Sequence, residues 1–429
     1  MSARNRELFG LIPAALLVTA GFAGVFIQRQ NALSNVSLTY GAIFLGLCLV
    51  AHICIRLTLP HADPYLFPLV ALLASFGIVM VYRIDSTLAR QQAQWFVVGL
   101  ILFVLTIIAF RDYRRLERYR YTIVAISLLL LALPRVPGIG AQVNGAYLEI
   151  KVPGGLSFQP TEFSKIGLVI FLASYLRDTR QVMVLGARRV FGITLPPLKH
   201  FGPVLVIWGL AMLALVLLSD IGSSLMFYGA LLSMLYVATG RLSFVVIGLI
   251  AFVLGAWFLG THISHVHARF EDWQHPFDHR LYFAQGGSFQ VANGIFAQAA
   301  GGLFGQGWGQ SILSLIPFPQ TDMIYAVITN ELGLFGASAV LLAYLLFVFR
   351  GFKAATMSRD SFSTLLATGL SAVFALQVFV IVGGVTRVIP LTGVTLPFIS
   401  YGGASIVANF VLLALLLLVS DRARRPAER

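Results

Sequence analysis

The run Leu242-Ser-Phe-Val-Val-Ile-Gly-Leu-Ile-Ala-Phe-Val-Leu-Gly-Ala-Trp-Phe-Leu-Gly260 holds 19 consecutive residues without a single charge. A helix of about 20 apolar residues spans the hydrocarbon core of a bilayer. Similar runs recur along all 429 residues, of which 58% are hydrophobic and only 11% charged. A soluble domain carries roughly 25% charged residues. The sequence therefore excludes a soluble fold and predicts a chain embedded in a membrane throughout.

The apolar runs predict an all-α, polytopic bundle of about twelve transmembrane helices. Their expected positions are 8–27, 38–57, 65–82, 92–110, 121–134, 161–176, 202–219, 222–239, 242–260, 323–349, 362–383 and 396–420. The runs at 121–134 and 161–176 are short or weak for spans. The first run lacks a convincing cleavage site and is followed at once by further runs, so we interpret it as a retained helix.

The distribution of Lys and Arg predicts which side of the membrane each connection faces. With a cytoplasmic N-terminus and alternating spans, 21 of the 30 basic residues fall inside and eight outside, with Lys165 within a span. Short cytoplasmic connections are enriched in Lys and Arg. We therefore expect both termini in the cytoplasm, in a multi-pass inner (cytoplasmic) membrane protein. The net charge of +13 then reflects topology, and no nucleic-acid partner is expected.

This orientation places two long connections on the outer face, at 135–160 and about 260–321. The second carries several histidines and acidic residues, and its stretch from Gln290 to Ala300 is amphipathic. Long connections in compact domains are usually functional or disordered. We expect this one to lie along the membrane surface and to fold into the mouth of the bundle.

Ionisable residues inside spans are costly and mark candidate functional positions. Glu162 and Lys165 lie three residues apart, on one helical face, and form either a structural ion pair or a substrate contact. Asp220 and Asp322 each precede an apolar run, so helix N-capping explains them as well as substrate binding does. Glu331 lies inside the tenth expected helix and requires a polar partner.

The stretch Pro390-Leu-Thr-Gly-Val-Thr-Leu-Pro-Phe-Ile-Ser-Tyr-Gly-Gly-Ala-Ser405 interrupts the apolar pattern with two prolines, three glycines and several hydroxyls. Irregular backbone at membrane depth is tolerated where protein buries it or where it lines a wet cavity. We therefore expect a broken or re-entrant helix that lines a cavity. A plain kinked loop is the alternative.

Five motifs together resemble the SEDS family of shape, elongation, division and sporulation proteins, which includes RodA, FtsW and SpoVE. The motifs are Gln159-Pro-Thr-Glu-Phe-Ser-Lys165, Asp220-Ile-Gly-Ser-Ser224, Gly301-Gly-Leu-Phe-Gly-Gln-Gly307, Thr321-Asp-Met-Ile-Tyr-Ala-Val-Ile-Thr-Asn-Glu-Leu-Gly333 and the stretch from Pro390 to Ser405. They occur in the family's order. Family members typically have ten spans, so the resemblance implies two additional N-terminal helices (1–60), a core (61–421) with an outer loop at 261–321, and a basic cytoplasmic tail (422–429).

The resemblance implies a peptidoglycan glycosyltransferase that polymerises lipid II and releases undecaprenyl-pyrophosphate. It also implies a class B penicillin-binding protein, a transpeptidase, as partner, besides the membrane lipid itself. The reaction needs a carboxylate to accept the proton of the attacking hydroxyl. Cationic side chains or a divalent cation, Mg or Mn, should offset the charge of the leaving pyrophosphate. No organic cofactor is expected.

The family's essential acid lies in the outer loop, in a block resembling W-x-D-P-x-x-D-P. This chain reads Trp273-Gln-His-Pro-Phe-Asp-His-Arg280, with His275 where an aspartate often precedes proline. We predict Asp278 as the catalytic base or metal-holding carboxylate. Asp272 and Glu271 remain rivals.

The other candidate residues fall into three groups. The resemblance implies that Glu162 and Lys165 act with the catalytic acid in the central cavity. Arg280 and Arg387 either meet the pyrophosphate or are rim charges without a role. The remaining candidates for substrate binding are Asp220, Asp322, Glu331, Thr395, Pro397, Ser400, Tyr401, Gly402, Gly403 and Ser405.

Two other functions use the same features. A lipid II flippase needs a cavity and buried charges, and a non-catalytic scaffold needs only a surface for a penicillin-binding protein. The acidic outer loop favours the enzyme, because a flippase needs no catalytic acid on one face.

Overall fold

The computed structural model describes residues 2–30, 35–143, 146–152, 156–185, 188–190, 193–195, 198–284 and 286–426. The long helices are α1 (Ala3–Gln30), α2 (Asn35–Thr58), α3 (Leu66–Ile84), α4 (Ser86–Ala109), α5 (Arg120–Ala132), α6 (Thr161–Leu185), α7 (Leu198–Leu217), α8 (Ile221–Thr239), α9 (Leu242–His262), α13 (Ile324–Met357), α14 (Ser361–Val385) and α15 (Gly403–Arg424). Shorter helices are α10 (Ser264–Gln274), α11 (His279–Phe283), α12 (Phe289–Gly301) and the 3₁₀ turns η1 (Tyr113–Tyr119), η2 (Leu133–Arg135) and η3 (Leu313–Leu315).

The predicted all-α membrane bundle is confirmed. Within the described residues, nine helices are long and apolar enough to cross a bilayer. The three other long helices, α5, α6 and α7, occupy the remaining expected positions. They are not counted among the nine because α5 has only 13 residues, α6 carries charged residues near both ends, and the apolar part of α7 extends only over Phe201–Leu217.

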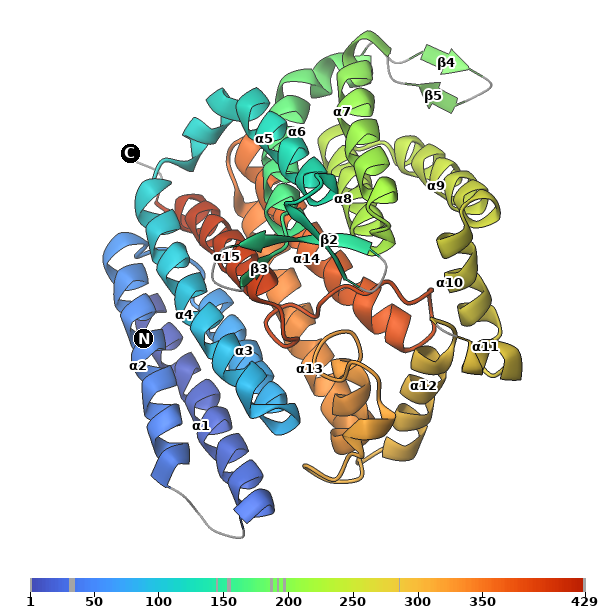
Figure 1. The fold of residues 1–429 in the computed structure, drawn as a ribbon. Coiled ribbons are helices and arrows are strands. Elements are labelled where there is room, and N and C mark those ends of the chain that lie inside the picture. Colours follow the sequence, from blue (N-terminus) through green and yellow to red (C-terminus); the bar gives the residue numbers. More distant parts are fainter. Residues whose placement is uncertain are drawn as a thin grey trace.

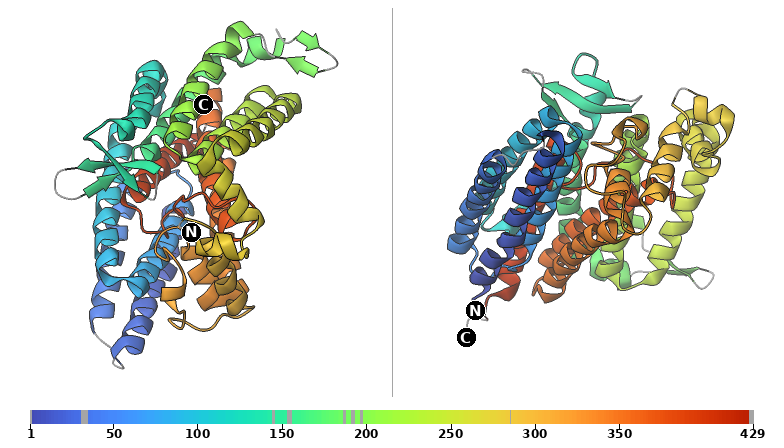
Figure 2. Two further views of the ribbon diagram at one scale, coloured as in Figure 1. Left: turned by 45° about the vertical axis from the view of Figure 1, so that its right-hand side comes forward. Right: turned by 90° about the horizontal axis from the view of Figure 1, so that it is seen from below.

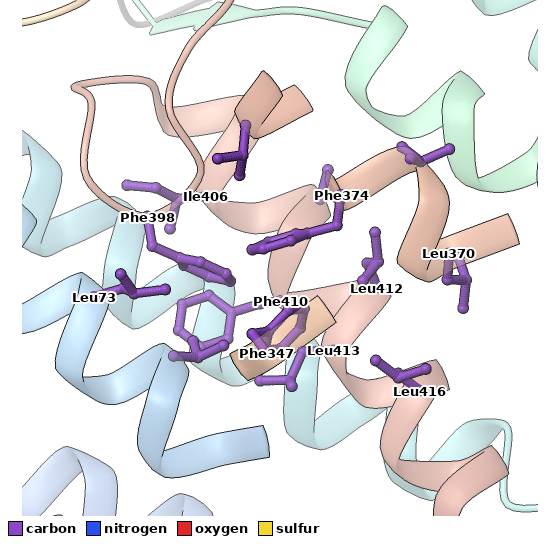
Figure 3. Close-up of a cluster of buried hydrophobic side chains, with 14 of the residues drawn as sticks. Leu73, Phe347, Leu370, Phe374, Phe398, Ile406, Phe410, Leu412, Leu413 and Leu416 are labelled. Carbon is purple, nitrogen blue, oxygen red and sulfur yellow. The ribbon is translucent and has the colours of Figure 1, made fainter. Parts of the chain in front are cut away.

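Helix α15 forms the centre of the bundle. Of its most apolar stretch of 18 residues, 89% is buried, whereas only 6% of the corresponding stretch of α9 is buried. Phe410 of α15 packs edge-on against Phe398, with ring centroids 5.2 Å apart. Phe347 of α13 meets Phe374 of α14 at 4.3 Å. Figure 3 shows these four rings in one cluster with leucines of α14 and α15. The core thus encloses the helix that follows the irregular stretch.

A small antiparallel sheet was not predicted from the sequence. It joins β1 (Gly140–Val143), β2 (Ala146–Val152) and β3 (Leu156–Phe158) in the order β1-β2-β3. A second hairpin pairs β4 (Arg188–Val190) with β5 (Ile193–Leu195). Figure 2 (right) shows the three-stranded sheet at the end of the bundle opposite the two termini. The sheet therefore covers the end where the outer connection 135–160 was expected.

The connection at 261–321 folds into α10, α11, α12 and η3. Helix α12 agrees with the amphipathic stretch expected near 290–300. Figure 1 shows α10–α12 on the side of the bundle opposite α1 and α2. Between α14 and α15 the chain runs from 386 to 402 without helix. The backbone of Phe398 in this segment presses against Gly77 of α3, where an added Cβ would lie 2.3 Å from the Phe398 oxygen.

The two N-terminal helices are fastened at both ends. At one end, Glu7 pairs with Arg4 and accepts from His52 Nδ1 at 2.7 Å. At the other, Gln28 Nε2 donates to the Gly309 carbonyl at 2.5 Å. These contacts join α1 to α2 and to the loop that precedes α13.

Candidate active site

A cavity of about 1020 Å³ lies between α4, the sheet, α6, α8, α10, α12 and the irregular segment. Its charged lining residues are Glu149, Glu162, Asp220, Arg269, Asp272 and Asp322, with His265 beside them. Thr392, Gly393, Val394, Thr395, Tyr401, Gly402, Gly403 and Ser405 line it from the irregular segment and the start of α15. The expected cavity-lining segment is thus observed. It contains turns and irregular backbone but no helix from 386 to 402, so the alternative of a loop describes it better than a broken helix does.

Two carboxyl groups outside the spans have strongly raised pKa values. Burial, followed by repulsion from Glu271, raises the pKa of Asp272 to about 6. Burial also raises the pKa of Asp322 to about 6, against the opposing influence of Arg269 and of a hydrogen bond with Gln290. A catalytic base works best when its pKa lies near the operating pH. Both aspartates meet this condition inside the cavity.

Arg269 contributes a positively charged side chain to the lining of this cavity. Its Nη1 donates to the Leu391 carbonyl at 2.6 Å, so α10 is fastened to the irregular segment. Its charge lowers the pKa of both Asp272 and Asp322, without outweighing their burial. An arginine among buried carboxylates can meet a phosphate with two parallel hydrogen bonds. Sequence reasoning placed Arg269 on the outer face but did not select it as a site residue.

Glu162 and Lys165 form the predicted ion pair, with Lys165 Nζ 2.5 Å from Glu162 Oε2. Lys165 is 1% exposed. It also donates to Gln377 Oε1 at 2.8 Å and to Asn409 Oδ1 at 3.4 Å. Glu162 reaches the cavity wall, whereas Lys165 lies behind it. The pair is therefore both a structural ion pair and, through Glu162, part of the lining.

Several cavity-lining residues have a buried polar atom without a hydrogen-bond partner in the described part of the chain, among them Asp220 Oδ2, His265 Nε2, Thr392 Oγ1 and Thr395 Oγ1. Asp220 Oδ1 accepts from Ser223 N at 3.0 Å, so the expected N-cap is present on α8. Leaving a buried polar group unpaired costs about 1–3 kcal/mol. A polar ligand that hydrogen-bonds these atoms would recover that cost.

Other candidates of the irregular segment hold its backbone in place. Ser400 Oγ donates to the Thr321 carbonyl at 2.8 Å and accepts from Leu396 N at 2.8 Å. Tyr401 OH donates to Gln91 Oε1 at 2.5 Å. The Pro397 carbonyl accepts from Tyr344 OH at 2.5 Å. Of the three candidates Pro397, Ser400 and Tyr401, only Tyr401 also lines the cavity.

Asp278 lies outside the cavity. It is exposed and caps α11, since its Oδ1 accepts from Arg280 N at 2.8 Å and Leu281 N at 3.3 Å. Its rival Asp272 is 9% exposed and lines the cavity. The difference arises because α10 ends at Gln274 and the chain then turns away at His275. The geometry thus favours Asp272 over the predicted Asp278.

Both predicted outer cations also lie outside the cavity lining. Arg280 is exposed on α11. Arg387 donates from Nε to the Trp273 carbonyl and from Nη2 to the Gln274 carbonyl, both at 2.9 Å. Arg387 therefore braces the turn after α10 rather than meeting a ligand in the cavity.

Glu331 and Asp322 were both candidates for substrate binding, and only Asp322 lines the cavity. Glu331 Oε1 lies 3.4 Å from Arg83 Nη2, and its Oε2 accepts from Gly309 N at 3.0 Å, outside the cavity. It therefore has the required polar partners, Arg83 of α3 and the loop residue Gly309. Glu331 attaches this loop to α3 and does not contact the cavity. Of the two alternatives for Asp322, helix capping is not observed, because α13 begins after Met323 and has no side-chain cap, whereas Asp322 lines the cavity.

The residues fit a divalent cation only when the substrate supplies further ligands. In the part of the chain that the structure describes, no group of three or more His, Cys, Asp or Glu side chains is arranged to hold a metal ion. Mg²⁺ commonly uses one or two carboxylates together with substrate phosphates. Asp322 is a half-buried carboxylate of this kind in the cavity wall, 3.6 Å from the position of an added Cβ at Gly393. The exposed Asp278 offers a single carboxylate already occupied as a cap.

Most of the chain matches a known protein family. The profile described as "Cell cycle protein", which groups the FtsW, RodA and SpoVE proteins, matches residues 63–425. The chain belongs to this family. The resemblance seen in the five sequence motifs is thereby confirmed, and the matched region begins just before α3.

Family relatives align with most or almost all of the chain. It is 40% identical over 434 residues to the peptidoglycan glycosyltransferase RodA of Mycobacterium leprae, covering 99% of this chain and 91% of that protein. It is 32% identical over 376 residues to the stage V sporulation protein E of Bacillus subtilis, covering 84% and 98%. The alignment with the first relative includes α1 and α2.

Solved structures of the FtsW/RodA/SpoVE family share the fold. A chain of a peptidoglycan synthase complex that coordinates polymerization and crosslinking matches with a TM-score of 0.69 and 28% identity, over 85% of this chain and 98% of that chain. The rod shape determining protein RodA of Thermus thermophilus matches with a TM-score of 0.61 and 28% identity, over 85% and 98%.

Proposed function

We propose that the protein is a peptidoglycan glycosyltransferase that polymerises lipid II into glycan strands. The observation that carries this proposal is the polar cavity, which combines buried carboxyl groups with an arginine in a member of the FtsW/RodA/SpoVE family. Its relative from Mycobacterium leprae is a peptidoglycan glycosyltransferase, and this chain aligns with 91% of it.

Asp272 is the base of the proposed reaction. A sugar hydroxyl of one lipid II molecule attacks the anomeric carbon of a second, and the bond from that carbon to the pyrophosphate oxygen breaks. Asp272 accepts the hydroxyl proton as the new glycosidic bond forms. Its pKa of about 6 leaves it ionised at neutral pH yet basic enough to take a proton.

The undecaprenyl-pyrophosphate leaving group requires positive charge at the far side of the reacting carbon. Arg269 supplies a fixed cation in the cavity. A divalent cation, Mg²⁺ or Mn²⁺, would neutralise further negative charge on the pyrophosphate. Asp322 is the carboxylate that we assign to it. Glu162, held by Lys165, and the unpaired oxygens of Asp220 and Thr395 contact the sugar or its linkage.

The reaction takes place on the outer face of the cytoplasmic membrane, with both termini in the cytoplasm. The basic residues favour this orientation, and the sheet and termini lie at opposite ends of the bundle. A class B penicillin-binding protein that crosslinks the new strands is the proposed partner. The fold shared with a chain of a peptidoglycan synthase complex supports it.

The decisive experiment supplies purified protein, with and without its transpeptidase partner, with lipid II in micelles and separates the products by size. Long glycan polymers support the enzyme. A parallel assay in vesicles measures transfer of fluorescent lipid II between leaflets. Transfer between leaflets without polymer formation would identify a flippase instead. If neither activity is detected, the scaffold function would be favoured. Labelling of single cysteines placed in 261–284 from the outer side tests the orientation.

A further inference from the structure

A second cavity, of about 510 Å³, lies at the end of the bundle that carries both termini. It is lined by Ala3, Arg6, Pro64, Tyr65, Arg350, Lys353, Met357 and Arg424. Figure 2 (right) shows both chain ends at this end of the bundle, remote from the sheet that covers the first cavity. Nothing in the proposed polymerisation uses this second cavity.

Four of the eight lining residues are cations, and they come from α1, α13 and α15. One buried carboxylate, Asp63, stands behind them, with Oδ1 3.2 Å from Arg350 Nε and Oδ2 paired with Arg424. Arg350 also stacks over the Tyr65 ring, 4.2 Å from its centroid. A single negative charge thus fixes the positions of two arginines and leaves the cavity with a net positive charge.

The two remaining cations, Arg6 and Lys353, are exposed. Neither forms an ion pair with any residue that the structure describes. The usual enrichment of basic residues on the cytoplasmic side explains their presence at this end. It does not explain why cations from three distant segments surround one cavity, with two of them preordered by a buried acid.

We propose that this cavity binds the phosphate of an anionic phospholipid headgroup. Arginine meets phosphate oxygens with paired hydrogen bonds, and basic pockets between helices on the cytoplasmic side favour anionic headgroups. Met357 and Ala3 add apolar wall at the level where the helices end, which suits a headgroup that remains attached to its acyl chains. The bound lipid joins α1, which precedes the family-matched region, to α13 and α15.

The test measures lipid retention by native mass spectrometry on the purified full chain, with phosphatidylglycerol and phosphatidylcholine as probes. Wild type should retain phosphatidylglycerol selectively. The double variant Arg6→Gln/Lys353→Gln should bind it roughly 10- to 30-fold more weakly, as expected for two lost surface cations. The matched control Arg111→Gln/Arg118→Gln removes two exposed cations near the start of α5 and should change retention little.

Three outcomes overturn the proposal: equal losses in both double variants, equal retention of the two lipids by wild type, or thermal stabilisation by millimolar inorganic phosphate as large as that by phosphatidylglycerol. The last result assigns the cavity to a free anion. Melting temperatures in phosphatidylcholine verify that each variant is folded. If the double variant unfolds, the single variant Lys353→Gln decides by the same criteria, because this side chain is exposed and makes no ion pair with the described residues.

Discussion

Arg269 Nη1 donates a 2.6 Å hydrogen bond to the carbonyl oxygen of Leu391, a residue 122 positions later in the chain. The bond ties α10 to the irregular segment between α14 and α15. Asp272 follows Arg269 by three residues on α10. The guanidinium charge of Arg269 lowers the pKa of Asp272 and also that of Asp322. One contact therefore sets both the shape and the electrostatics of the proposed active site.

The replacement Asp272→Asn should lower the rate of lipid II polymerisation by about 10²–10⁴, the usual contribution of a general base. The amide keeps the shape of the side chain but does not accept the proton. Asp278→Asn is the matched control on the same connection between α9 and α13 and should retain activity, because Asp278 only caps α11. The opposite pattern would restore Asp278 as the base. Initial rates on equal amounts of folded protein provide the measurement.

Polymerisation should decline as the pH falls through about 6. The base must be ionised to act, and the pKa of Asp272 is raised to about 6, so the active fraction is lost below that value. Asp322 has a pKa of about 6 as well. A pH–rate profile of Asp322→Asn separates the two, since its midpoint should stay near 6 if Asp272 is responsible. A wild-type rate that is constant from pH 5 to 7 contradicts this assignment.

Removal of divalent cations should abolish most polymerisation, and added Mg²⁺ or Mn²⁺ should restore it. The cation offsets charge on the pyrophosphate and shares its ligands with Asp322 in our proposal. In Asp322→Asn the cation concentration for half-maximal rate should increase, with a smaller effect on the rate at saturation. Full activity in the presence of a chelator would remove the cation from the mechanism.

Lys165→Met should destabilise the fold by about 3–5 kcal/mol, because it leaves the buried Glu162 carboxylate without its cation. The double variant Glu162→Gln/Lys165→Met should recover part of this loss, since no uncompensated charge remains. Thermal unfolding in detergent measures both. The ion pair contributes less than its burial suggests if the single variant melts like wild type.

Glu331→Gln should lower the melting temperature while leaving the apparent KM for lipid II unchanged. Glu331 binds Arg83 and the Gly309 amide in a loop anchor outside the cavity. Its loss weakens the attachment of this loop rather than a substrate contact. A raised KM with unchanged stability would return Glu331 to the substrate-binding set.

Much of the architecture could be predicted because each transmembrane helix satisfies its backbone hydrogen bonds internally. The run at 242–260 reads as a span whatever its neighbours are, and α9 agrees with it. The apolar runs at 121–134 and 161–176 gave weaker signals, because α5 is short and α6 carries charged residues. The β1–β3 sheet escaped prediction, since strand pairing depends on partners elsewhere in the chain.

The sequence could predict many residues of the candidate site, but only part of their spatial arrangement. The Glu162–Lys165 pair follows from helical spacing alone, and the irregular segment follows from its prolines and glycines. Asp272 and Asp278 cannot be ranked by spacing, because both are acids near Trp273. Where α10 ends decides which of the two faces the cavity.

The sequence by itself determined that this chain is a helical membrane protein with a long connection that carries acidic residues and an irregular stretch before its last helix, because hydrophobicity and helical periodicity act locally. Only the tertiary structure decided that Asp272, Asp322 and Arg269 share one cavity while Glu331 and Arg387 brace loops. Burial and charge proximity are set by contacts between residues far apart in the chain, such as Arg269 and Leu391. Such contacts shift a pKa and select the reacting groups, and no local pattern encodes them.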